Sequence, residues 1–412
     1  MGDPATAALS WTNWFGTQSC RPERIVAAAD HAQVATAVSD AAERGSTVRV
    51  AGSGHSASPL CTTSGTLLIL ERMRGIVEVD RARRRVVALP ATRIADLGEP
   101  LYSAGLALDS QSDIDTQQLA GAIATATHGS DVRVGSSSAA VRRLRLITAT
   151  GEALEIGADD PELLLAAQVS MGMLGVVVEV ELELTDAYFI RERTELWSWD
   201  EVVDRWDEAF AGNFSFFWLP TDASRDLFDL GVPSGEPVAD RALVRFYEKV
   251  PVLPETEIVS DRGRRVDRAY RIYPYEFDPD HRELEYMVPF ERGREAAEAV
   301  RAAMRERHPD VVLPVELRAV RGDDAHLSPS HGRDSAVIAV AAQPHQAFIP
   351  FLRAIDELLR PFDPRPHWGK IHFFDRERLR ATLPAFDRFV AIRRRLDPDG
   401  VFLNEHLREL FA

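Results

Sequence analysis

The sequence predicts an α+β protein built from two domains. Its 412 residues exceed the length that usually packs around a single hydrophobic core. Segments of helical periodicity alternate with short strand patterns as far as residue 186, and longer, aromatic-rich strands and helices follow. A hydrophobic fraction of 45% and a charged fraction of 27% are ordinary for globular proteins, which argues against a disordered or fibrous chain.

The first domain, residues 1–186, is predicted to combine helices with strands that end in glycine turns. Apolar spacing over 25–42 favours an amphipathic helix, and the stretch 46–54 favours a strand entering a glycine turn. The further predicted elements are strands in 65–73 and 75–89, a helix in 91–105, a hairpin in 141–156, and a helix, a glycine break and a strand in 161–184.

The second domain is predicted to span residues 187–375, with residues 376–412 returning to the first domain. Residues 250–279, rich in proline and arginine, are expected to form a long excursion over the surface. The predicted regular elements are helices in 197–210 and 347–362 and strands in 214–220, 311–320 and 334–343.

Net charge and cysteine content exclude several classes of binding partner and site. A net charge of −16 disfavours nucleic acid, whose phosphates this surface would repel, and a neutral small substrate fits better. The two cysteines, Cys20 and Cys61, match no metal-ligand spacing, so we expect neither a metal site nor a disulfide framework. The sequence has no run of about 18 apolar residues and no leader pattern, so we expect a cytoplasmic protein without membrane insertion.

A glycine turn with a histidine at its tip follows the strand that starts near residue 46. Its residues are Gly52, Ser53, Gly54, His55 and Ser56. Such a turn offers unhindered amides to a pyrophosphate, and the histidine can reach the rim of a flavin ring. A structural turn whose histidine only forms hydrogen bonds is the alternative. A nicotinamide-binding fingerprint is excluded, because alanine stands at the third glycine position and no helix with an acidic residue follows.

A second segment, DIDTQQLAGAIATATHG over 113–129, is dense in glycine, alanine and hydroxyl residues. Small residues let backbone amides approach a ligand closely, whereas a tightly packed helix on a sheet is the structural alternative.

Two charged groups mark the second domain. Glu316 and Arg318 are two residues apart in a predicted strand, so both side chains lie on one face and can clamp a polyol. An ion pair on a solvated face is the alternative. In the segment HWGK, Lys370 supplies a cation that can stabilise negative charge on a bound ligand.

The order and spacing of four segments resemble the vanillyl-alcohol-oxidase-type FAD proteins. The segments are VAGSGHSASPLC, DIDTQQLAGAIATATHG, SMGMLGVVVEVEL and RPHWGKIH. Over nearly its whole length the chain is most similar to the aldonolactone and alditol oxidase branch, which includes gulonolactone and arabinonolactone oxidases. The resemblance implies an N-terminal FAD-binding domain of the PCMH type and a C-terminal substrate, or cap, domain with an antiparallel sheet.

The resemblance also implies the site residues. It implies a covalent bond from His55 to the flavin 8α-methyl group, with Glu316, Arg318 and Lys370 at the catalytic centre. The implied cofactor contacts are Gly52, Ser53, Gly54, His55, Ser56, Ser112, Asp115, Gly121, Ala122, Thr125, Thr127, His128, Gly129, Gly175 and Val176. The implied substrate contacts are Gln118, Gln343 and Glu285.

The implied reaction is hydride transfer from a CH–OH carbon of a polyol or sugar lactone to flavin N5, with O₂ as the acceptor and H₂O₂ as the product. Glu316, Arg318 as an electrostatic partner, or an ordered water are the candidates that assist loss of the hydroxyl proton. The alternatives are a dehydrogenase that uses a quinone or protein acceptor, a tailoring enzyme that acts on an unusual polyol, and a flavin-binding module without turnover. One departure favours an unusual substrate: Ala341 stands where many relatives carry histidine.

Overall fold

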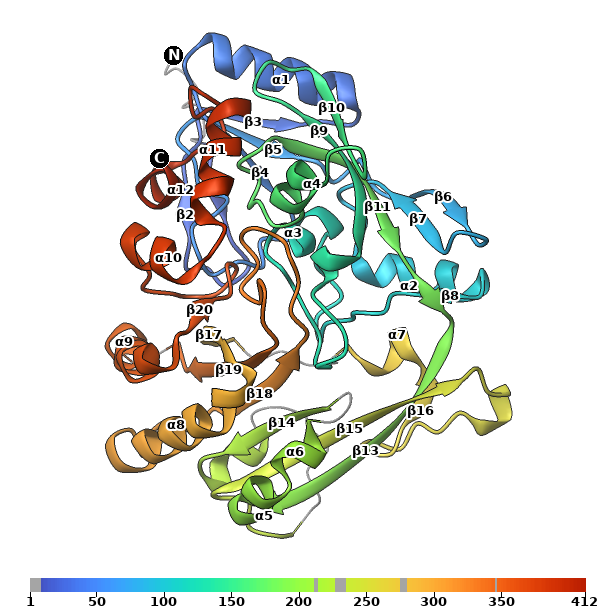
Figure 1. Ribbon diagram of the computed structural model, residues 1–412, viewed down its shortest axis with the longest axis vertical. Coiled ribbons are helices and arrows are strands. Elements are labelled where there is room, and N and C mark those ends of the chain that lie inside the picture. The colour runs from blue at the N-terminus through green and yellow to red at the C-terminus, as the bar shows by residue number, and fades with distance from the viewer. Residues whose placement is uncertain (1–8, 211–213, 227–234, 275–279, 345–346) are drawn as a thin grey trace, which may run out of the picture.

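The computed structural model describes residues 9–210, 214–226, 235–274, 280–344 and 347–412. Figure 1 shows two regions stacked along the long axis, with the N-terminal half and the last helices in one and a large sheet in the other. Helices and an antiparallel sheet in two regions confirm the predicted α+β fold class.

The first region contains two main sheets. A parallel sheet has the order β3-β5-β4, and a five-stranded antiparallel sheet has the order β10-β9-β11-β7-β6. The strands are β1 (Trp11–Thr12), β2 (Ser19–Cys20), β3 (Arg24–Ala27), β4 (Val48–Ala51), β5 (Thr66–Ile69), β6 (Ile76–Asp80), β7 (Arg85–Ala88), β8 (Leu106–Ala107), β9 (Val141–Ile147), β10 (Ala153–Ile156), β11 (Val176–Glu183) and β12 (Thr185–Asp186). The helices are α1 (His31–Glu43), α2 (Ile94–Ser103), α3 (Leu119–Ala124) and α4 (Pro161–Gln168).

The helix expected over 25–42 is shorter than predicted. Its first residues instead form β3, which pairs in parallel with β5 and leaves Ile25 and Val26 half-buried. The helix begins at His31, because the Asp30 carboxylate accepts a hydrogen bond from the Gln33 amide at 2.8 Å and caps the first turn. Strand pairing far along the chain overrides the local helical spacing.

The second region is one antiparallel sheet of eight strands with the order β16-β13-β15-β14-β18-β19-β17-β20. Its strands are β13 (Tyr188–Ser198), β14 (Phe214–Leu219), β15 (Arg241–Pro251), β16 (Val266–Arg268), β17 (Arg282–Pro289), β18 (Val315–Val320), β19 (Ser335–Ala342) and β20 (Arg365–Pro366). Its helices are α5 (Trp199–Asp204), α6 (Trp206–Ala209), α7 (Ala269–Ile272), α8 (Gly293–Arg307) and α9 (Phe348–Leu359). The excursion expected over 250–279 includes β16 and α7; its residues 275–279 lie outside the described chain.

The two faces of this sheet have different environments. On β19, Ile338 and Val340 belong to the main core together with Leu352 of α9, so helices cover that face. Ala339 and Ala341 alternate with them and therefore lie on the opposite face. Ala339 and Ala341 line a cavity there, which makes this face of the sheet one wall of the site.

The last three helices pack against the first region. They are α10 (Arg376–Thr382), α11 (Phe386–Leu396) and α12 (Glu405–Phe411). The Val48 amide of β4 donates to the Val401 carbonyl at 2.7 Å, and Phe402 shares a core cluster with Val48. Figure 1 shows these helices along one side of the first region, where α11 contacts α4.

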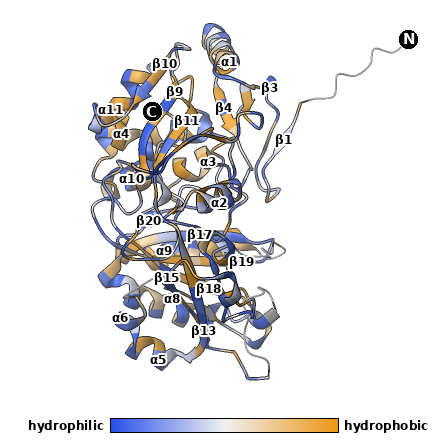
Figure 2. Ribbon diagram, turned by 90° about the vertical axis from the view of Figure 1, so that its right-hand side faces the viewer, coloured by the Kyte–Doolittle hydropathy of each residue, from blue (hydrophilic) through white to orange (hydrophobic). Residues whose placement is uncertain are grey.

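Apolar residues are distributed over many short elements. Figure 2 shows short hydrophobic and hydrophilic stretches mixed along the helices and strands. Within the described ranges, no helix combines the length and apolar character needed to cross a bilayer.

Candidate functional site

Two cavities lie along the segment 118–128. The first, which we call the glycine-lined cavity, has a volume of about 800 Å³ and is lined from the first region and by Phe402. The second, the charged cavity, has a volume of about 760 Å³ and lies between the segment 112–128 and the face of the eight-stranded sheet. Helix α3 lines the first cavity and Thr127 and His128 line the second, so one continuous segment connects them.

Five of the predicted cofactor contacts line the glycine-lined cavity. They are Gly52, Ser56, Gly121, Thr125 and Gly175. A Cβ on Gly121 would meet no atom within 4 Å, which leaves the backbone of α3 open to a ligand. Gly175 has φ +151° and lies so close to Ile147 that a Cβ would be 2.8 Å from the carbonyl oxygen.

Arg49 gives the glycine-lined cavity a positive charge that the sequence analysis missed. Its three guanidinium nitrogens donate to the carbonyls of Leu60 at 2.7 Å, Phe402 at 2.6 Å and Met171 at 2.6 Å. Burial lowers the pKa of Arg49 to about 10, so the side chain stays charged at pH 7. Among the described residues, no carboxylate lines this cavity or forms an ion pair with Arg49. A glycine-lined wall beside a cation that has no ion-pair partner in the described chain fits a pyrophosphate-bearing ligand.

The loop that carries His55 is held from two sides. On one side, the Ala57 amide donates to the Gly369 carbonyl at 2.7 Å and the Ser58 hydroxyl to the Trp368 carbonyl at 2.5 Å. The first and fourth sequence segments are therefore joined directly, and Lys370 lies beside this loop.

On the other side, the N-terminal segment covers the loop. Asn13 Nδ2 donates to the Ser56 carbonyl at 3.0 Å, and the Trp14 amide donates to the Gly54 carbonyl at 2.9 Å. The rings of Trp14 and Phe15 lie 5.0 and 5.7 Å from the ring of His55. The sequence analysis missed this segment, since a two-residue strand pair such as β1 and β2 leaves no periodic signal.

His55 is neutral at pH 7. Burial, followed by the charges of Lys370 and His281, lowers its pKa to about 4. Within the described residues, its buried Nε2 has no hydrogen-bond partner. A neutral imidazole with an unused nitrogen fits a bond or a contact to a bound cofactor.

Strand register assembles the charged cavity. Glu316 and Arg318 of β18, and Glu283 and Glu285 of β17, flank the central strand β19 on the cavity side. Ala339 lies opposite both Glu285 and Glu316. On this face of the sheet, only its methyl group therefore lies between these two residues. Glu283 was not predicted, because its importance depends on this register.

Arg318 lies among three carboxylates. Its guanidinium donates to Glu285 at 2.5 Å and to Asp113 at 3.3 Å, and its Nε lies 3.6 Å from Glu316. Burial opposes the charged form of Arg318, but Glu316 and Glu285 outweigh burial and raise its pKa. One guanidinium cannot balance three carboxylates.

This excess of carboxylates over cations affects the protonation of Glu316. Burial, only partly offset by Arg318, raises the pKa of Glu316 to about 8. In the described chain, its buried Oε1 has no hydrogen-bond partner. Glu316 is therefore a carboxyl group on the cavity wall that can gain or lose a proton near neutral pH.

Lys370 forms an ion pair with Glu283. Burial opposes the charged form of Lys370, but Glu283 and Glu285 raise its pKa. Burial likewise favours the protonated form of Glu283, yet Lys370 and His281 hold its pKa at about 2. Lys370 therefore stays protonated on the cavity wall, with its charge balanced by the Glu283 carboxylate.

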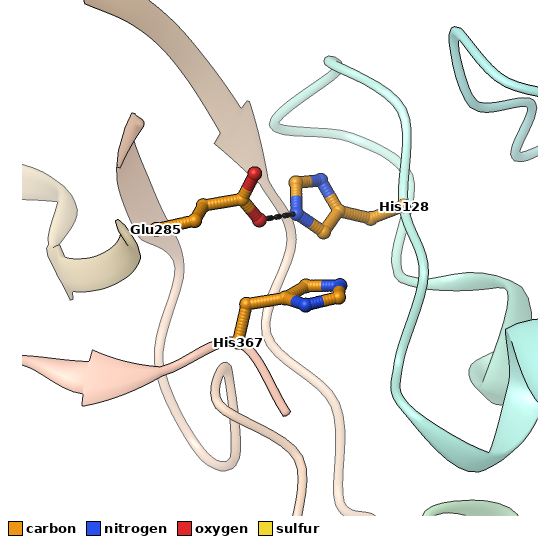
Figure 3. A group of neighbouring side chains, drawn as sticks. All are labelled: His128, Glu285 and His367. Atoms are coloured by element: carbon orange, nitrogen blue, oxygen red, sulfur yellow. Dashed lines mark hydrogen bonds and ion pairs between the residues drawn. The ribbon is translucent and has the colours of Figure 1, made fainter. Parts of the chain in front are cut away.

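Figure 3 shows His128, Glu285 and His367 pointing toward one another across the two regions. His128 Nε2 lies 3.0 Å from Glu285 Oε1, and the three side chains offer ligand atoms within 4.8 Å of one another. The other Glu285 oxygen accepts a hydrogen bond from Arg318. The guanidinium therefore already balances the negative charge that would attract a metal ion to this carboxylate. We interpret the group as a hydrogen-bonded network.

Several predicted site residues lie elsewhere. Gln118 lines the glycine-lined cavity, where its amide donates to Glu71 at 2.6 Å, and its neighbour Gln117 lines the charged cavity. Gln343 follows the end of β19 and is not among the residues that line the charged cavity. Ala341 lines it.

The remaining predicted cofactor contacts surround the two cavities without lining the glycine-lined one. Ser112 lines the charged cavity and, with Asp115, a smaller cavity against α2. Gly129 packs so tightly that a Cβ would lie 2.3 Å from the Gln111 carbonyl oxygen. Ser53, Gly54, His55, Ala122 and Val176 are absent from the lining of both cavities.

Two family models match the chain. The model described as FAD binding domain matches residues 22–157, and the model described as D-arabinono-1,4-lactone oxidase matches residues 232–410. The first match contains the His55 loop and helix α3, and the second contains Glu316, Arg318 and Lys370.

Characterised relatives match the chain along almost its whole length. An L-gulono-1,4-lactone dehydrogenase from Mycobacterium tuberculosis is 33% identical, covering 98% of this chain and 99% of the relative. An alditol oxidase from a Streptomyces species is 31% identical, covering 97% and 98%. Cholesterol oxidase from B. sterolicum has the same fold with a TM-score of 0.80 at 14% identity, covering 98% of this chain and 96% of that chain.

Proposed function

Because this chain belongs to the aldonolactone oxidase family of FAD-dependent oxidoreductases, we propose that it oxidises a CH–OH carbon of an aldonolactone, alditol or related polyol with O₂ as the electron acceptor. The observation that carries the proposal is the pair of cavities lined by one continuous segment, one suited to a pyrophosphate and one lined by Glu316, Arg318 and Lys370. A flavin-binding module without turnover would have no use for the unpartnered Glu316 oxygen on the cavity wall.

The residues of the glycine-lined cavity are proposed to hold FAD. Gly52, Gly121 and Gly175 supply close backbone approach, and Arg49 supplies the charge that the pyrophosphate requires. When bound, FAD supplies the acceptor for the hydride that leaves the carbinol carbon. His55 is proposed to bond covalently to the flavin, since its neutral ring presents an unpartnered nitrogen.

The residues of the charged cavity are proposed to orient the carbinol and remove its proton. Glu316, with a pKa of about 8, accepts the hydroxyl proton as the carbonyl forms. Arg318 lies beside it and stabilises the carboxylate form of Glu316 and the polarised substrate oxygen. Lys370, held in place by Glu283, would offer a cation to the negative charge that hydride transfer leaves on bound FAD.

The reaction is tested by mixing the purified yellow protein with aldonolactones and alditols without oxygen and following the loss of flavin absorbance. We expect bleaching with at least one of these carbinols, and recovery of the colour with formation of H₂O₂ when oxygen is admitted. Retention of FAD with no bleaching by any carbinol of the panel would contradict the proposal. Bleaching that O₂ fails to reverse, while a dye does reverse it, would identify the dehydrogenase that the name of the M. tuberculosis relative favours.

The covalent bond is tested by acid denaturation followed by filtration. We expect the flavin to stay with the wild-type chain and to pass the filter after His55→Ala. His128→Ala is the matched control, because His128 lies in the charged cavity and its removal leaves His55 intact. Free flavin from the wild-type protein would refute the covalent bond and leave the FAD assignment standing.

A further inference from the structure

The floor of the charged cavity is formed by two alanine residues of strand β19. Strand β19 lies between the charged strands β17 and β18, and its two residues that line the cavity are Ala339 and Ala341. Ala341 lies opposite Glu283, whose carboxylate is held by Lys370, and Ala339 lies beneath the guanidinium that crosses to Glu285. The floor therefore offers two methyl groups to a ligand.

One corner of this cavity is apolar on three sides. The register of β18 with β19 pairs Val315 with Val340, which brings Pro314 next to Ala341. Proline has no backbone N–H, so this position lacks the donor that any other residue would provide. Phe217 of β14 lies opposite Glu316 and lines the same cavity. We call Phe217, Pro314 and Ala341 the apolar corner.

The two carboxyl groups that border this corner are already engaged: Glu283, opposite Ala341, is held by Lys370, and Glu316, opposite Phe217, is the group proposed to take the proton of the reacting hydroxyl. Glu285 is paired with Arg318 and His128. A fully hydroxylated ligand would bring hydroxyl groups against the apolar corner, where they would lose water without gaining a hydrogen-bond partner. An apolar group in the same place would lose nothing and would bury its surface.

We propose that the charged cavity takes a carbinol whose hydroxyl groups are confined to one end and whose other end is apolar, such as a deoxy or alkyl-substituted polyol or lactone. The hydroxyl end binds at Glu316 and Arg318, and the apolar end binds in the apolar corner. This inference rests on the proposed function, and the reaction is the same: the carbinol carbon gives up a hydride to the bound FAD and the hydroxyl gives up a proton to Glu316, which leaves a carbonyl.

The test compares two substrates that share a five-carbon chain, xylitol and 1,2-pentanediol. We expect kcat/KM for 1,2-pentanediol to exceed that for xylitol by about tenfold or more, the range in which a lost apolar contact or an unpaired hydroxyl discriminates. Ala341→Thr places a hydroxyl in the apolar corner and is expected to reduce this ratio about tenfold, and Ala341→Ser is a smaller second variant with the same expected direction. Val340→Thr is the matched control, because Val340 shares strand β19 but belongs to the main core on the helix-covered face and does not line the cavity.

The outcomes separate this inference from the proposed function. A wild-type protein that prefers xylitol overturns the apolar corner and leaves the oxidase assignment intact. An equal ratio in wild type and both Ala341 variants overturns it as well. If the FAD-loaded protein oxidises neither xylitol nor 1,2-pentanediol nor any lactone or other alditol, both proposals fail together.

Discussion

The two cavities are built in contrasting ways. The glycine-lined cavity combines backbone from a few short segments with one cation, Arg49, whose hydrogen bonds go to carbonyls. The charged cavity is built from side chains on neighbouring strands, and nearly every charge in it faces an opposite charge. The first site therefore depends on backbone shape, and the second on strand register and charge balance.

This contrast predicts which property each substitution changes. A change in the glycine-lined cavity should alter FAD retention, because that cavity suits the pyrophosphate. A change in the charged cavity should alter turnover, because the titratable group lies there. A charged-cavity variant that loses FAD, or a variant of the glycine-lined cavity that keeps FAD but loses turnover, would contradict this division.

The largest effect is expected for Glu316→Gln. The amide keeps the shape of the side chain but cannot accept the hydroxyl proton, so the rate of flavin reduction should fall by about 10²–10⁴-fold while FAD content stays unchanged. In the wild type the rate should rise with pH through about 8, because burial raises the pKa of Glu316 to about 8 and the ionised form is the base. Stopped-flow reduction at several pH values measures both effects.

The variant supplies its own control for this titration. The pH-dependent rise near 8 should be absent from Glu316→Gln. A rise that persists in the variant would assign the proton to another group, and a loss of FAD from the variant would show that the two cavities are not separable.

The next effect is expected for Arg49→Met. This change leaves the carbonyls of Leu60, Met171 and Phe402 without a donor, at a cost of about 1–3 kcal/mol for each carbonyl that stays unpaired. It also removes the positive charge of the cavity, so folded protein should lose FAD. Thermal unfolding and the flavin content of the folded fraction measure the two consequences separately.

Arg365 is the matched control, because it is also buried and also bonds to backbone carbonyls, those of Thr382, Pro329 and His331. Arg365→Met should reduce stability to a similar extent and leave FAD bound, since Arg365 does not line the glycine-lined cavity. If both variants lose FAD equally, the charge of Arg49 has no specific role in the cavity.

The same contrast explains what the sequence could predict. The fold class, the His55 turn and helix α3 depend on residues that are neighbours in the chain, so their patterns are visible in the sequence. Glu316 and Arg318 were recognised because they share a strand. Glu283 was not, because its position opposite Ala341 follows from a register that no local pattern records.

Two further features depended on long-range contacts. Arg49 looks like an ordinary strand residue until its partners Phe402 and Met171, from distant segments, surround it. The start of α1 was predicted too early because β3 forms only when β5 pairs with it. Gln118 was expected in the substrate site, but the side chain of its neighbour Gln117 lines that cavity instead. A sequence pattern cannot tell which of two adjacent residues lines one cavity and which lines the other.

The smallest effect is expected for Asn13, which connects the N-terminal segment to the His55 loop. Its Oδ1 accepts from the amides of Thr17 and Gln18 at 2.9 Å each, and its Nδ2 donates to the Ser56 carbonyl. Asn13→Ala should lower the free energy of local opening by about 1 kcal/mol both in the N-terminal segment and in the His55 loop. This change corresponds to about fivefold faster hydrogen exchange in the two segments. Asn13→Asp keeps the acceptor but loses the donor, so exchange should speed up around Ser56 alone. Equal exchange around Ser56 in both variants and wild type would mean that the N-terminal segment covers His55 without holding its loop in place.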